Sequence, residues 1–337
     1  MQPFASHTVD IDRTVVRRRL AELPRLPIGH YPTPVDEMPR LRAAIGGGPR
    51  LLVKRDDLIS FGCGGNKVRK VEMVAARAVA EGADTLISTG GVQSNHARVV
   101  AAIAARLSMN CVLVVNGSPQ AAGATGNARL MNLFGAQVEY VPTRQARVDR
   151  MRELASELEA SGRRPFIVPL GASTGLGALG FVLATGELLT QIEPPDAIVL
   201  ASSSGGTQAG LAAGCAVFEM PTRVVGISAD DPADDIAQVA RSLVRASGEL
   251  LAINRPLDEL VAAMEVDDRF VGAGYGAPTA GSIEAATLAA ATEGLVLDPV
   301  YTAKAMAALI AYVREGRFTA DQTVLFWHTG GVPGFFA

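Results

Sequence analysis

Residues 85–115, TLISTGGVQSNHARVVAAIAARLSMNCVLVV, decide the fold class of this chain. The stretch begins with a strand-forming segment, TLIST, passes through a glycine pair into a helix-forming segment at 94–107, and runs into a strand segment that extends over 111–117. A strand, a helix and a second strand in this order predict one unit of a parallel α/β sheet. The VLVV run of the second strand, residues 112–115, is apolar throughout, as expected where helices cover both faces of a sheet.

The same alternation of helix and strand patterns continues on both sides of this unit. Residues 68–82 predict a preceding helix that ends at Gly82. Further helices are expected at 125–135, 147–162, 172–192, 206–218, 233–251, 283–294 and 302–316, and further strands at 136–141, 165–171, 196–204, 222–229 and 323–328. We therefore predict an α/β protein with open, twisted, mostly parallel sheets flanked by helices. Alanine-rich helices allow close approach to the sheets, which explains a core with few aromatic residues.

The composition narrows the choice of partner. The chain has 337 residues, of which 48% are hydrophobic and 19% charged, with a formal net charge of −3. This length predicts about two domains, and the apolar content excludes a disordered chain. A slightly acidic chain without long basic runs offers no surface for the phosphates of a nucleic acid. We expect a small-molecule ligand and no nucleic-acid partner.

The cysteines and the apolar runs indicate the compartment. Cys63, Cys111 and Cys215 are odd in number and widely spaced, which argues against a disulfide scaffold and for a reducing compartment. No spacing of metal ligands occurs, and no metal is expected. The first residues lack the apolar core of a signal peptide, and no run of about 18 apolar residues predicts a membrane span. We predict a cytoplasmic protein with no membrane partner.

The first segment with chemical potential is GGNKVRK, residues 64–70, where a glycine-rich loop meets the start of a predicted helix. Lys67, at the opening of that helix, suits a nucleophilic amine, because burial and neighbouring cations lower the pKa of a lysine. Lys70 lies one turn further along. The alternatives are a loop lysine without a role for Lys67, and a surface residue or an anion contact for Lys70.

The second segment places four polar residues, Gln93, Ser94, Asn95 and His96, at a predicted helix N-terminus. Backbone N–H groups and the helix dipole make such an end an anion site, suited to a carboxylate or a phosphate. Three successive polar side chains exceed what helix capping requires. The alternatives are a plain N-cap for Ser94 and a hydrogen-bonded structural histidine for His96.

The third segment is ASSSGGTQAGL, residues 201–211, again a strand, a turn of small residues and a helix. Residues 203–207 can wrap backbone N–H groups around a phosphate, and their hydroxyls add donors. The segment lacks the lysine of a nucleoside-triphosphate loop and the G-x-G-x-x-G pattern of a dinucleotide site. A tight strand-to-helix turn without any ligand would favour the same residues.

Two tyrosines and one threonine complete the candidates. Tyr275 and Tyr301 lie in loops marked by glycine and proline, in GAGYGAPT and LDPVYTAKAM. In HTGGVPG, residues 328–334, Thr329 follows the last strand at the sheet edge where open α/β proteins bind ligands. The alternatives are tyrosines at the edge of the core with their hydroxyls in water, and a strand-end hydroxyl bonded to backbone.

These segments together fit one cofactor. An imine-forming amine, a phosphate loop and a carboxylate site are the three items that pyridoxal phosphate and an amino-acid substrate need. The motifs GGNKVRK, GGVQSNH, SSSGGTQAGL, DPVYT and HTGGVPG resemble the D-cysteine desulfhydrase and 1-aminocyclopropane-1-carboxylate (ACC) deaminase family of pyridoxal-phosphate enzymes, of the tryptophan synthase β type. The resemblance runs from about Leu26 to the C-terminus. Each motif alone is weak, but the combination is specific.

The resemblance implies a role for each motif residue. Lys67 would form the covalent imine with the cofactor, Lys70 and the 203–207 turn would hold its phosphate, and Asn95 would bond its ring hydroxyl. Ser94 and the neighbouring amides would bind the substrate carboxylate or take part in proton transfer. The implied catalytic residues are Lys67, Ser94, Tyr275 and Tyr301; the cofactor residues are Lys67, Lys70, Asn95, Ser203, Ser204, Gly205, Gly206, Thr207, Thr302 and Thr329; and the substrate residues are Gln93, Ser94, Asn95, His96, Tyr275 and Tyr301.

The resemblance also implies the organisation of the molecule. A large cofactor-binding domain would consist of residues 1–62 and 172–337, and a small domain of residues 63–171 would be inserted in it. The active site would lie in the cleft between the two domains. The family leads us to expect a homodimer.

Two positions separate activities within the family. ACC deaminases carry a glutamate after the second tyrosine and a leucine before the final glycine pair, where this chain has Thr302 and Thr329. Hydroxyls supply no charge beside the pyridine nitrogen, and a milder electron sink suffices to lose a good β-leaving group. We therefore favour α,β-elimination of D-cysteine to pyruvate, hydrogen sulfide and ammonia. The alternatives are an L-cysteate sulfo-lyase, an ACC deaminase and a non-catalytic pyridoxal-phosphate carrier.

One residue and one missing group stay open at this point. Cys63 stands where the family has small or apolar residues, and it is either a small filler or part of the leaving-group pocket. A sulfonate leaving group would require an additional donor or cation. The sequence alone offers no candidate for that group.

Overall fold

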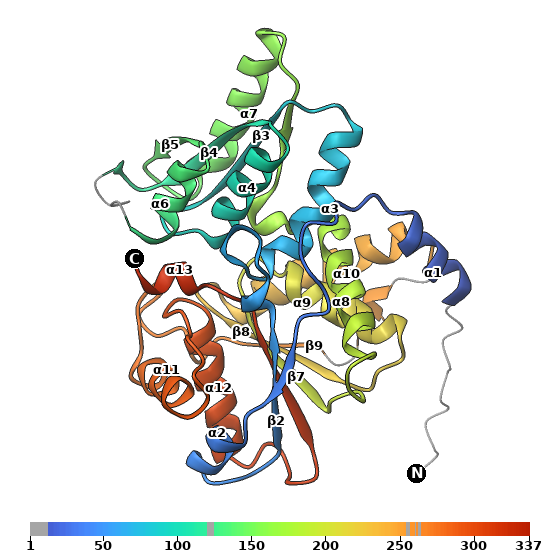
Figure 1. Cartoon of the computed structure of the whole chain (residues 1–337), viewed down its shortest axis with the longest axis vertical. Coiled ribbons are helices and arrows are strands. Elements are labelled where there is room, and N and C mark those ends of the chain that lie inside the picture. Colours follow the sequence, from blue (N-terminus) through green and yellow to red (C-terminus); the bar gives the residue numbers. More distant parts are fainter. Residues whose placement is uncertain (1–12, 120–124, 254–256, 260, 262–263) are drawn as a thin grey trace.

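The computed structural model describes residues 13–119, 125–253, 257–259, 261 and 264–337. Its described strands form two sheets, one of six strands in the order β1-β2-β10-β7-β8-β9 and one of four strands in the order β5-β4-β3-β6. All pairings are parallel except that of β1 with β2. The predicted fold class, mostly parallel sheets flanked by helices, is confirmed (Figure 1).

The elements have the following bounds. The strands are β1 Val35–Glu37, β2 Arg50–Arg55, β3 Thr85–Gly91, β4 Asn110–Asn116, β5 Gln137–Val141, β6 Pro165–Ile167, β7 Ala197–Ser202, β8 Arg223–Ser228, β9 Met264–Asp267 and β10 Thr323–His328. The helices are α1 Arg13–Glu22, α2 Pro39–Ala44, α3 Lys67–Ala80, α4 Asn95–Arg106, α6 Gly126–Leu133, α7 Ala146–Ala160, α8 Gly175–Leu188, α9 Gly206–Val217, α10 Ala233–Leu250, α11 Ala280–Glu293, α12 Thr302–Arg314 and α13 Val332–Phe335. Short 3-10 turns occur at Asp56–Leu58, Phe61–Cys63, Leu170–Ala172 and Leu257–Glu259.

The six-stranded sheet is buried on both faces because its central strands alternate between two apolar clusters. In β10, Leu325 and Trp327 pack into the cluster formed with α8, α9 and α10, whereas Phe326 packs into the cluster formed with α2, α11 and α12. Side chains along a strand point to opposite faces in turn, so a strand covered on both sides must be apolar at every position. The aromatic-poor core relies on close approach: a Cβ at Gly210 of α9 would lie 2.2 Å from the carbonyl oxygen of Ala178 in α8.

The four-stranded sheet is also covered by apolar clusters on both faces, with fewer helices. In β3, Leu86 joins the cluster with α3, α4 and α6, and Ile87 joins the cluster with α7. Figure 1 shows this sheet and its helices in the upper part of the molecule and the six-stranded sheet below. Every strand of the small sheet comes from residues 85–167, which supports our domain limits of 63–171 against 1–62 and 172–337. Those limits stay a prediction.

A buried ionic network fixes helix α3, whose first residue is Lys67, against the large sheet. Arg69 donates to both oxygens of Asp56, at 2.9 and 2.8 Å, and to Oε2 of Glu187 at 2.8 Å. Trp327 Nε1 donates to Asp56 at 2.9 Å, and Lys54 Nζ donates to Glu187 at 2.6 Å. Buried charges persist only when they are paired and hydrogen-bonded. The network therefore joins β2, α3, α8 and β10 and sets the position of α3.

The helix and strand predictions from residue 68 onward were confirmed with end shifts of a few residues. The strand expected at 165–171 is shorter, because β6 ends at Ile167 and a 3-10 turn follows at Leu170–Ala172. The elements before residue 68, the edge strand β9 and the short helix α13 were not predicted. None of the described helices is long and apolar enough to span a membrane. Cys63, Cys111 and Cys215 are free thiols.

Candidate active site

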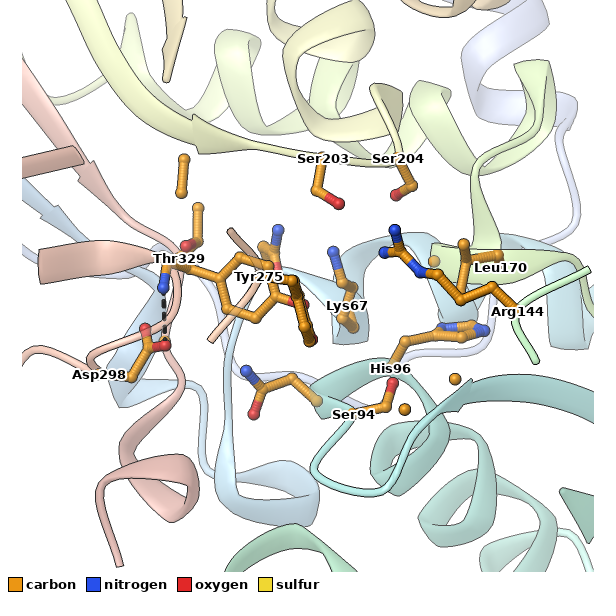
Figure 2. A pocket seen from close by; sticks show the side chains of 18 of the residues that line it. Lys67, Ser94, His96, Arg144, Leu170, Ser203, Ser204, Tyr275, Asp298 and Thr329 are labelled. Atoms are coloured by element: carbon orange, nitrogen blue, oxygen red, sulfur yellow. Dashed lines mark hydrogen bonds between the residues drawn. The ribbon is translucent and has the colours of Figure 1, made fainter. Parts of the chain in front are cut away.

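A cavity opens where the parallel strands of both sheets end. Its walls include Gly90 and Gly91 at the end of β3, Ser203 just after β7, and Thr329 just after β10. The carboxyl ends of parallel strands are where open α/β sheets bind ligands. Figure 2 shows side chains from the loops and helix starts that follow these strands around this space. Nine of the predicted site residues line it: Lys67, Ser94, Asn95, His96, Ser203, Ser204, Tyr275, Tyr301 and Thr329.

Lys67 reaches the cavity from the first turn of α3. The loop before it depends on Gly65, whose φ is 98° and whose hypothetical Cβ would lie 2.9 Å from the carbonyl oxygen of Thr329. Asn66 N donates to that same oxygen at 2.9 Å, and Asn66 Nδ2 donates to Thr207 Oγ1 at 2.9 Å. These bonds fix the start of α3 against β10 and α9, and so they fix Lys67.

Lys67 also stands apart from the other lysines of the chain. The sequence has only four lysines. Lys54 is paired with Glu187, Lys70 donates to Ser173 Oγ at 3.2 Å, and Lys304 donates to three backbone carbonyls. Lys67 alone among them lines the cavity. Burial lowers its pKa to about 8, and a hydrogen bond with Lys70 opposes that shift. The neutral, nucleophilic fraction of this amine near neutral pH is therefore much larger than that of an ordinary lysine.

Lys70 lies behind Lys67 and does not line the cavity. Burial, followed by the charge and hydrogen bond of Lys67, holds the pKa of Lys70 well below its ordinary value. Ser173, which accepts from Lys70, is 2.8 Å from the hydroxyl of Ser204. Lys70 is thus joined to the 203–207 turn through one serine.

The 203–207 turn forms the N-terminus of α9. Gly205 occupies the N-cap with a left-handed φ of 71°, and no side chain caps the helix. A Cβ at Gly206 would lie 2.5 Å from Ser173 Oγ, so the turn approaches its neighbours too closely for a larger residue. The first N–H groups of an uncapped helix lack intrahelical acceptors and attract an anion. The hydroxyl of Thr207 points to Asn66 instead of the cavity.

The start of α4 presents the second polar edge. Ser94 is the N-cap and accepts from Ala97 N at 3.2 Å. Asn127 Nδ2 donates to the carbonyl of Gln93 at 2.9 Å and to Asn95 Oδ1 at 3.0 Å, which turns the NH₂ group of Asn95 away from Asn127. Gln93 itself does not line the cavity, because its side-chain oxygen accepts from Asn127 N at 2.8 Å.

His96 is a buried, neutral imidazole. Its Nε2 lies 2.9 Å from the hydroxyl of Ser88, which donates to the carbonyl of Val168 at 2.8 Å. Burial, with the charges of Lys67 and Lys70 adding to it, holds the pKa of His96 well below its ordinary value. The structure thus places His96 in the wall of the cavity with a hydrogen bond of the kind expected for a structural histidine.

The two tyrosines form a pair in the wall of the cavity. Their hydroxyls are 2.6 Å apart and their rings meet edge to face. Burial raises the pKa of both phenols, so both stay protonated at neutral pH. Lys304 supports the loop that carries Tyr275, because its ammonium donates to the carbonyls of Val271 and Gly274 at 2.8 and 3.0 Å.

Thr302 lies outside the cavity wall, one layer behind Asp298. Its hydroxyl donates to Asp298 Oδ1 at 2.7 Å and accepts from Asp298 N at 2.8 Å. Asp298, which the sequence did not single out, lines the cavity and accepts from the backbone N–H groups of Val300 and Tyr301. Thr302 would therefore reach a ligand only through Asp298, whereas Thr329 lines the cavity directly. Cys63 is exposed and is not part of the cavity wall.

Sequence reasoning also missed two arginines. Arg144 and Arg147, before and at the start of α7, line the cavity beside Asn116. Their segment, TRQARVDRM, follows a strand as the other motifs do, but it contains no glycine turn and resembles an ordinary amphipathic helix. Only the tertiary structure shows that the end of β5 carries them into the site.

The site fits pyridoxal phosphate on the geometry alone. A buried amine with a lowered pKa, an uncapped helix N-terminus and an amide with a free NH₂ group surround one cavity. The sequence pattern of pyridoxal-phosphate-dependent enzymes matches residues 26–330. The chain belongs to this family. Its cofactor is pyridoxal 5'-phosphate.

Named relatives agree with this assignment. The chain is 38% identical over 328 residues to a D-cysteine desulfhydrase of Klebsiella pneumoniae strain 342, which covers 95% of this chain and 98% of the relative. It is 39% identical over 330 residues to a D-cysteine desulfhydrase of Serratia proteamaculans strain 568, with 96% and 98% covered. Among solved structures, an ACC deaminase homologue superposes with a TM-score of 0.86 at 33% identity, over 95% of this chain and 96% of the other.

Proposed function

We propose that this family member is a carbon–sulfur lyase that converts D-cysteine and water into pyruvate, hydrogen sulfide and ammonia by α,β-elimination. The observation that carries the proposal is Lys67, the one lysine of the cavity wall, set between an anion-binding helix end and the Ser94 edge. The choice of D-cysteine as the substrate rests on the D-cysteine desulfhydrases that match nearly the whole chain.

We assign the cofactor contacts as follows. Lys67 Nζ would bond the cofactor aldehyde, and the N–H groups of residues 205–207, with the Ser203 and Ser204 hydroxyls, would hold the phosphate. Lys70 would act on that phosphate through Ser173. Asn95 would donate its NH₂ group to the ring hydroxyl, since Asn127 occupies its Oδ1. When bound, the cofactor supplies the electron sink that acidifies the α-carbon of the amino acid.

We assign the substrate contacts to the start of α4, to Lys67 and to the tyrosine pair. Ser94 and the N–H groups at the start of α4 would bind the substrate carboxylate, as expected at a helix N-terminus. Lys67 Nζ, once exchanged for the substrate amine, would be free to accept the α-proton as a general base. Tyr275 and Tyr301 would close the substrate side as neutral hydrogen-bond donors and exclude water from it.

ACC deamination is the second candidate, because the ACC deaminase homologue superposes over nearly the whole chain. Ring opening of ACC would yield 2-oxobutyrate instead of pyruvate. We rank it lower because Thr302 replaces the glutamate of the deaminases, so the carboxylate beside it is Asp298, which is already occupied by Thr302 and backbone N–H groups. A pyridoxal-phosphate carrier would not need Ser94 or the tyrosine pair.

We further propose that the protein acts as a homodimer in the cytoplasm. The family resemblance supports the dimer, and the free thiols of Cys63, Cys111 and Cys215 suit a reducing compartment. Light scattering of the purified protein tests the first statement.

A panel of amino acids tests the activity. The loaded enzyme would be supplied with D-cysteine, L-cysteine, β-chloro-D-alanine, L-cysteate and ACC, and pyruvate, 2-oxobutyrate and sulfide would be measured. We expect pyruvate and sulfide in equal amounts from D-cysteine and no 2-oxobutyrate from ACC. Formation of 2-oxobutyrate from ACC at the highest rate of the panel would overturn the proposal, and pyridoxal-phosphate colour without any turnover would favour the carrier.

A further inference from the structure

Arg147 is a nearly buried cation in the wall of the active site. Only 9% of the residue is exposed, yet it lines the cavity. Its Nε donates to the carbonyl of Arg144 at 3.0 Å and its Nη1 donates to Asn116 Oδ1 at 3.1 Å. Both acceptors are neutral. Within the described residues no carboxylate lies within ion-pair distance of Arg147, and its Nη2 has no protein acceptor.

The nearest carboxylates, those of Asp230 and Asp231, pair with the neighbouring Arg144 and form no ion pair with Arg147. Arg144 pairs with Asp230 and, at 3.6 Å, with Asp231, and its guanidinium lies 5.5 Å from the centre of the Tyr275 ring. Asp230 and Asp231 thus pair with Arg144, and their charges act on Arg147 only from beyond ion-pair distance, where they partly offset the lowering of its pKa. Burial, followed by the charge of Arg144, lowers the pKa of Arg147. An unpaired buried charge is costly, so a site that retains one gains from an anion that arrives with the ligand.

The position of Arg147 separates it from the other two anion sites of the cavity. The phosphate site lies at the start of α9, and the carboxylate site at the start of α4. Arg147 belongs to α7 and is held by Asn116 at the end of β4, while the adjacent Arg144 reaches the ring of Tyr275 on the substrate side. The cavity wall thus carries a third positive site, on an element other than those expected to hold the cofactor phosphate and the substrate carboxylate.

We propose that Arg147, oriented by Asn116, forms the subsite for the β-substituent of the substrate and stabilises negative charge on it. This inference rests on the proposed elimination. In that reaction the α-proton passes to Lys67 Nζ, the electron pair of the Cα–H bond forms the Cα=Cβ bond, and the pair of the Cβ–S bond leaves on sulfur as hydrosulfide. A guanidinium beside the sulfur stabilises this anion as the bond breaks. The same subsite would accept a sulfonate, which would leave as sulfite.

The substrate class thus becomes amino acids whose β-substituent carries or acquires a negative charge. Arg147 also supplies the cation that a sulfonate requires and that the sequence did not reveal. Hydrogen bonds to charged groups contribute about 1.5–3 kcal/mol, which corresponds to roughly 10- to 150-fold in a dissociation constant. We expect a preference near the lower end of this range, because the cavity is open to solvent.

Equilibrium binding tests the proposal without any turnover. Aspartate and asparagine have nearly the same shape, differ by one charge in the β-substituent and carry no leaving group. Their dissociation constants for the loaded enzyme would be measured by titration calorimetry, in both enantiomeric forms. We expect the wild type to bind the preferred enantiomer of aspartate about 10-fold more tightly than asparagine, and Arg147→Gln to bind both equally. Arg147→Lys would retain part of the preference.

The controls separate the proposal from its competitors. Arg152→Gln, on an exposed arginine of the same helix, should leave both constants unchanged. If Arg147 bound the α-carboxylate, Arg147→Gln would weaken aspartate and asparagine by the same factor, which would overturn the inference. Equal binding of the two by the wild type would overturn it as well, even where a variant does not fold. A clear preference for aspartate in an enzyme that releases no sulfide from D-cysteine would sustain the subsite and refute the elimination.

Discussion

The lowered pKa of Lys67 predicts how fast the protein takes up its cofactor at each pH. Imine formation requires the neutral amine. With a pKa of about 8, roughly 10% of the Lys67 amine is neutral at pH 7, whereas about 0.03% of an amine with the ordinary lysine value of 10.5 would be. Burial thus raises the neutral fraction of the Lys67 amine about 300-fold at pH 7.

The direction of the pH dependence follows from this shift. Because the pKa in the folded protein lies below the ordinary value, the loading rate should rise with pH up to about 8 and level off above it. The assay mixes cofactor-free protein with pyridoxal phosphate from pH 6 to 11 and follows the visible absorbance of the imine. Free Nα-acetyl-lysine is the control, and its rate should rise up to the ordinary lysine pKa of about 10.4.

A matched variant tests the cause. Lys70→Met removes the hydrogen bond that raises the pKa of Lys67, so the midpoint of the loading profile should move to lower pH. A wild-type midpoint that coincides with that of acetyl-lysine would refute the argument that burial activates Lys67. A midpoint unchanged by Lys70→Met would refute the coupling of the two amines.

Three further changes test other contacts. Asp56→Ala should lower the free energy of unfolding in urea by about 3–5 kcal/mol, because it removes one of the two carboxylates that pair with the buried Arg69, while Glu157→Ala on the exposed face of α7 should leave it nearly unchanged. Equal effects would contradict the role of the buried network. Asn127→Asp should weaken pyridoxal phosphate binding by about 10-fold in equilibrium dialysis, since it loses the donor that orients a cofactor ligand; unchanged affinity would exclude this role. Lys304→Met should speed hydrogen exchange in residues 271–275, and unchanged protection there would show that the ammonium does not hold the loop.

Much of the fold could be predicted because its signals are local. The apolar runs of β4 and β7 and the alanine-rich helices between strands carry the α/β alternation in their own residues. Strand β2, at Arg50–Arg55, was missed because three apolar residues between charges are too short a signal. The edge strand β9, at Met264–Asp267, is half-polar and is defined by its pairing with β8, which no local pattern shows.

The candidate site divides in the same way. Glycine-containing motifs mark Lys67, Ser94 and the 203–207 turn, so the sequence alone indicates these parts of the site. Arg144 and Arg147 were missed because they reach the site only through the tertiary structure, which places the segment between β5 and α7 at the cavity. Asp298 had a signal that was overlooked, since an aspartate before the start of a helix is a capping residue by type. The scarcity of lysine, four in the chain, was also visible in the sequence and would have strengthened Lys67.

The position of the covalent bond to the cofactor tests the account most directly. The loaded protein would be reduced with borohydride, digested and analysed by mass spectrometry for the pyridoxyl group. With only four lysines in the chain, each peptide can be assigned. The account predicts the adduct on Lys67 and its loss in Lys67→Ala. An adduct on Lys54, Lys70 or Lys304, with Lys67 unmodified, would contradict it.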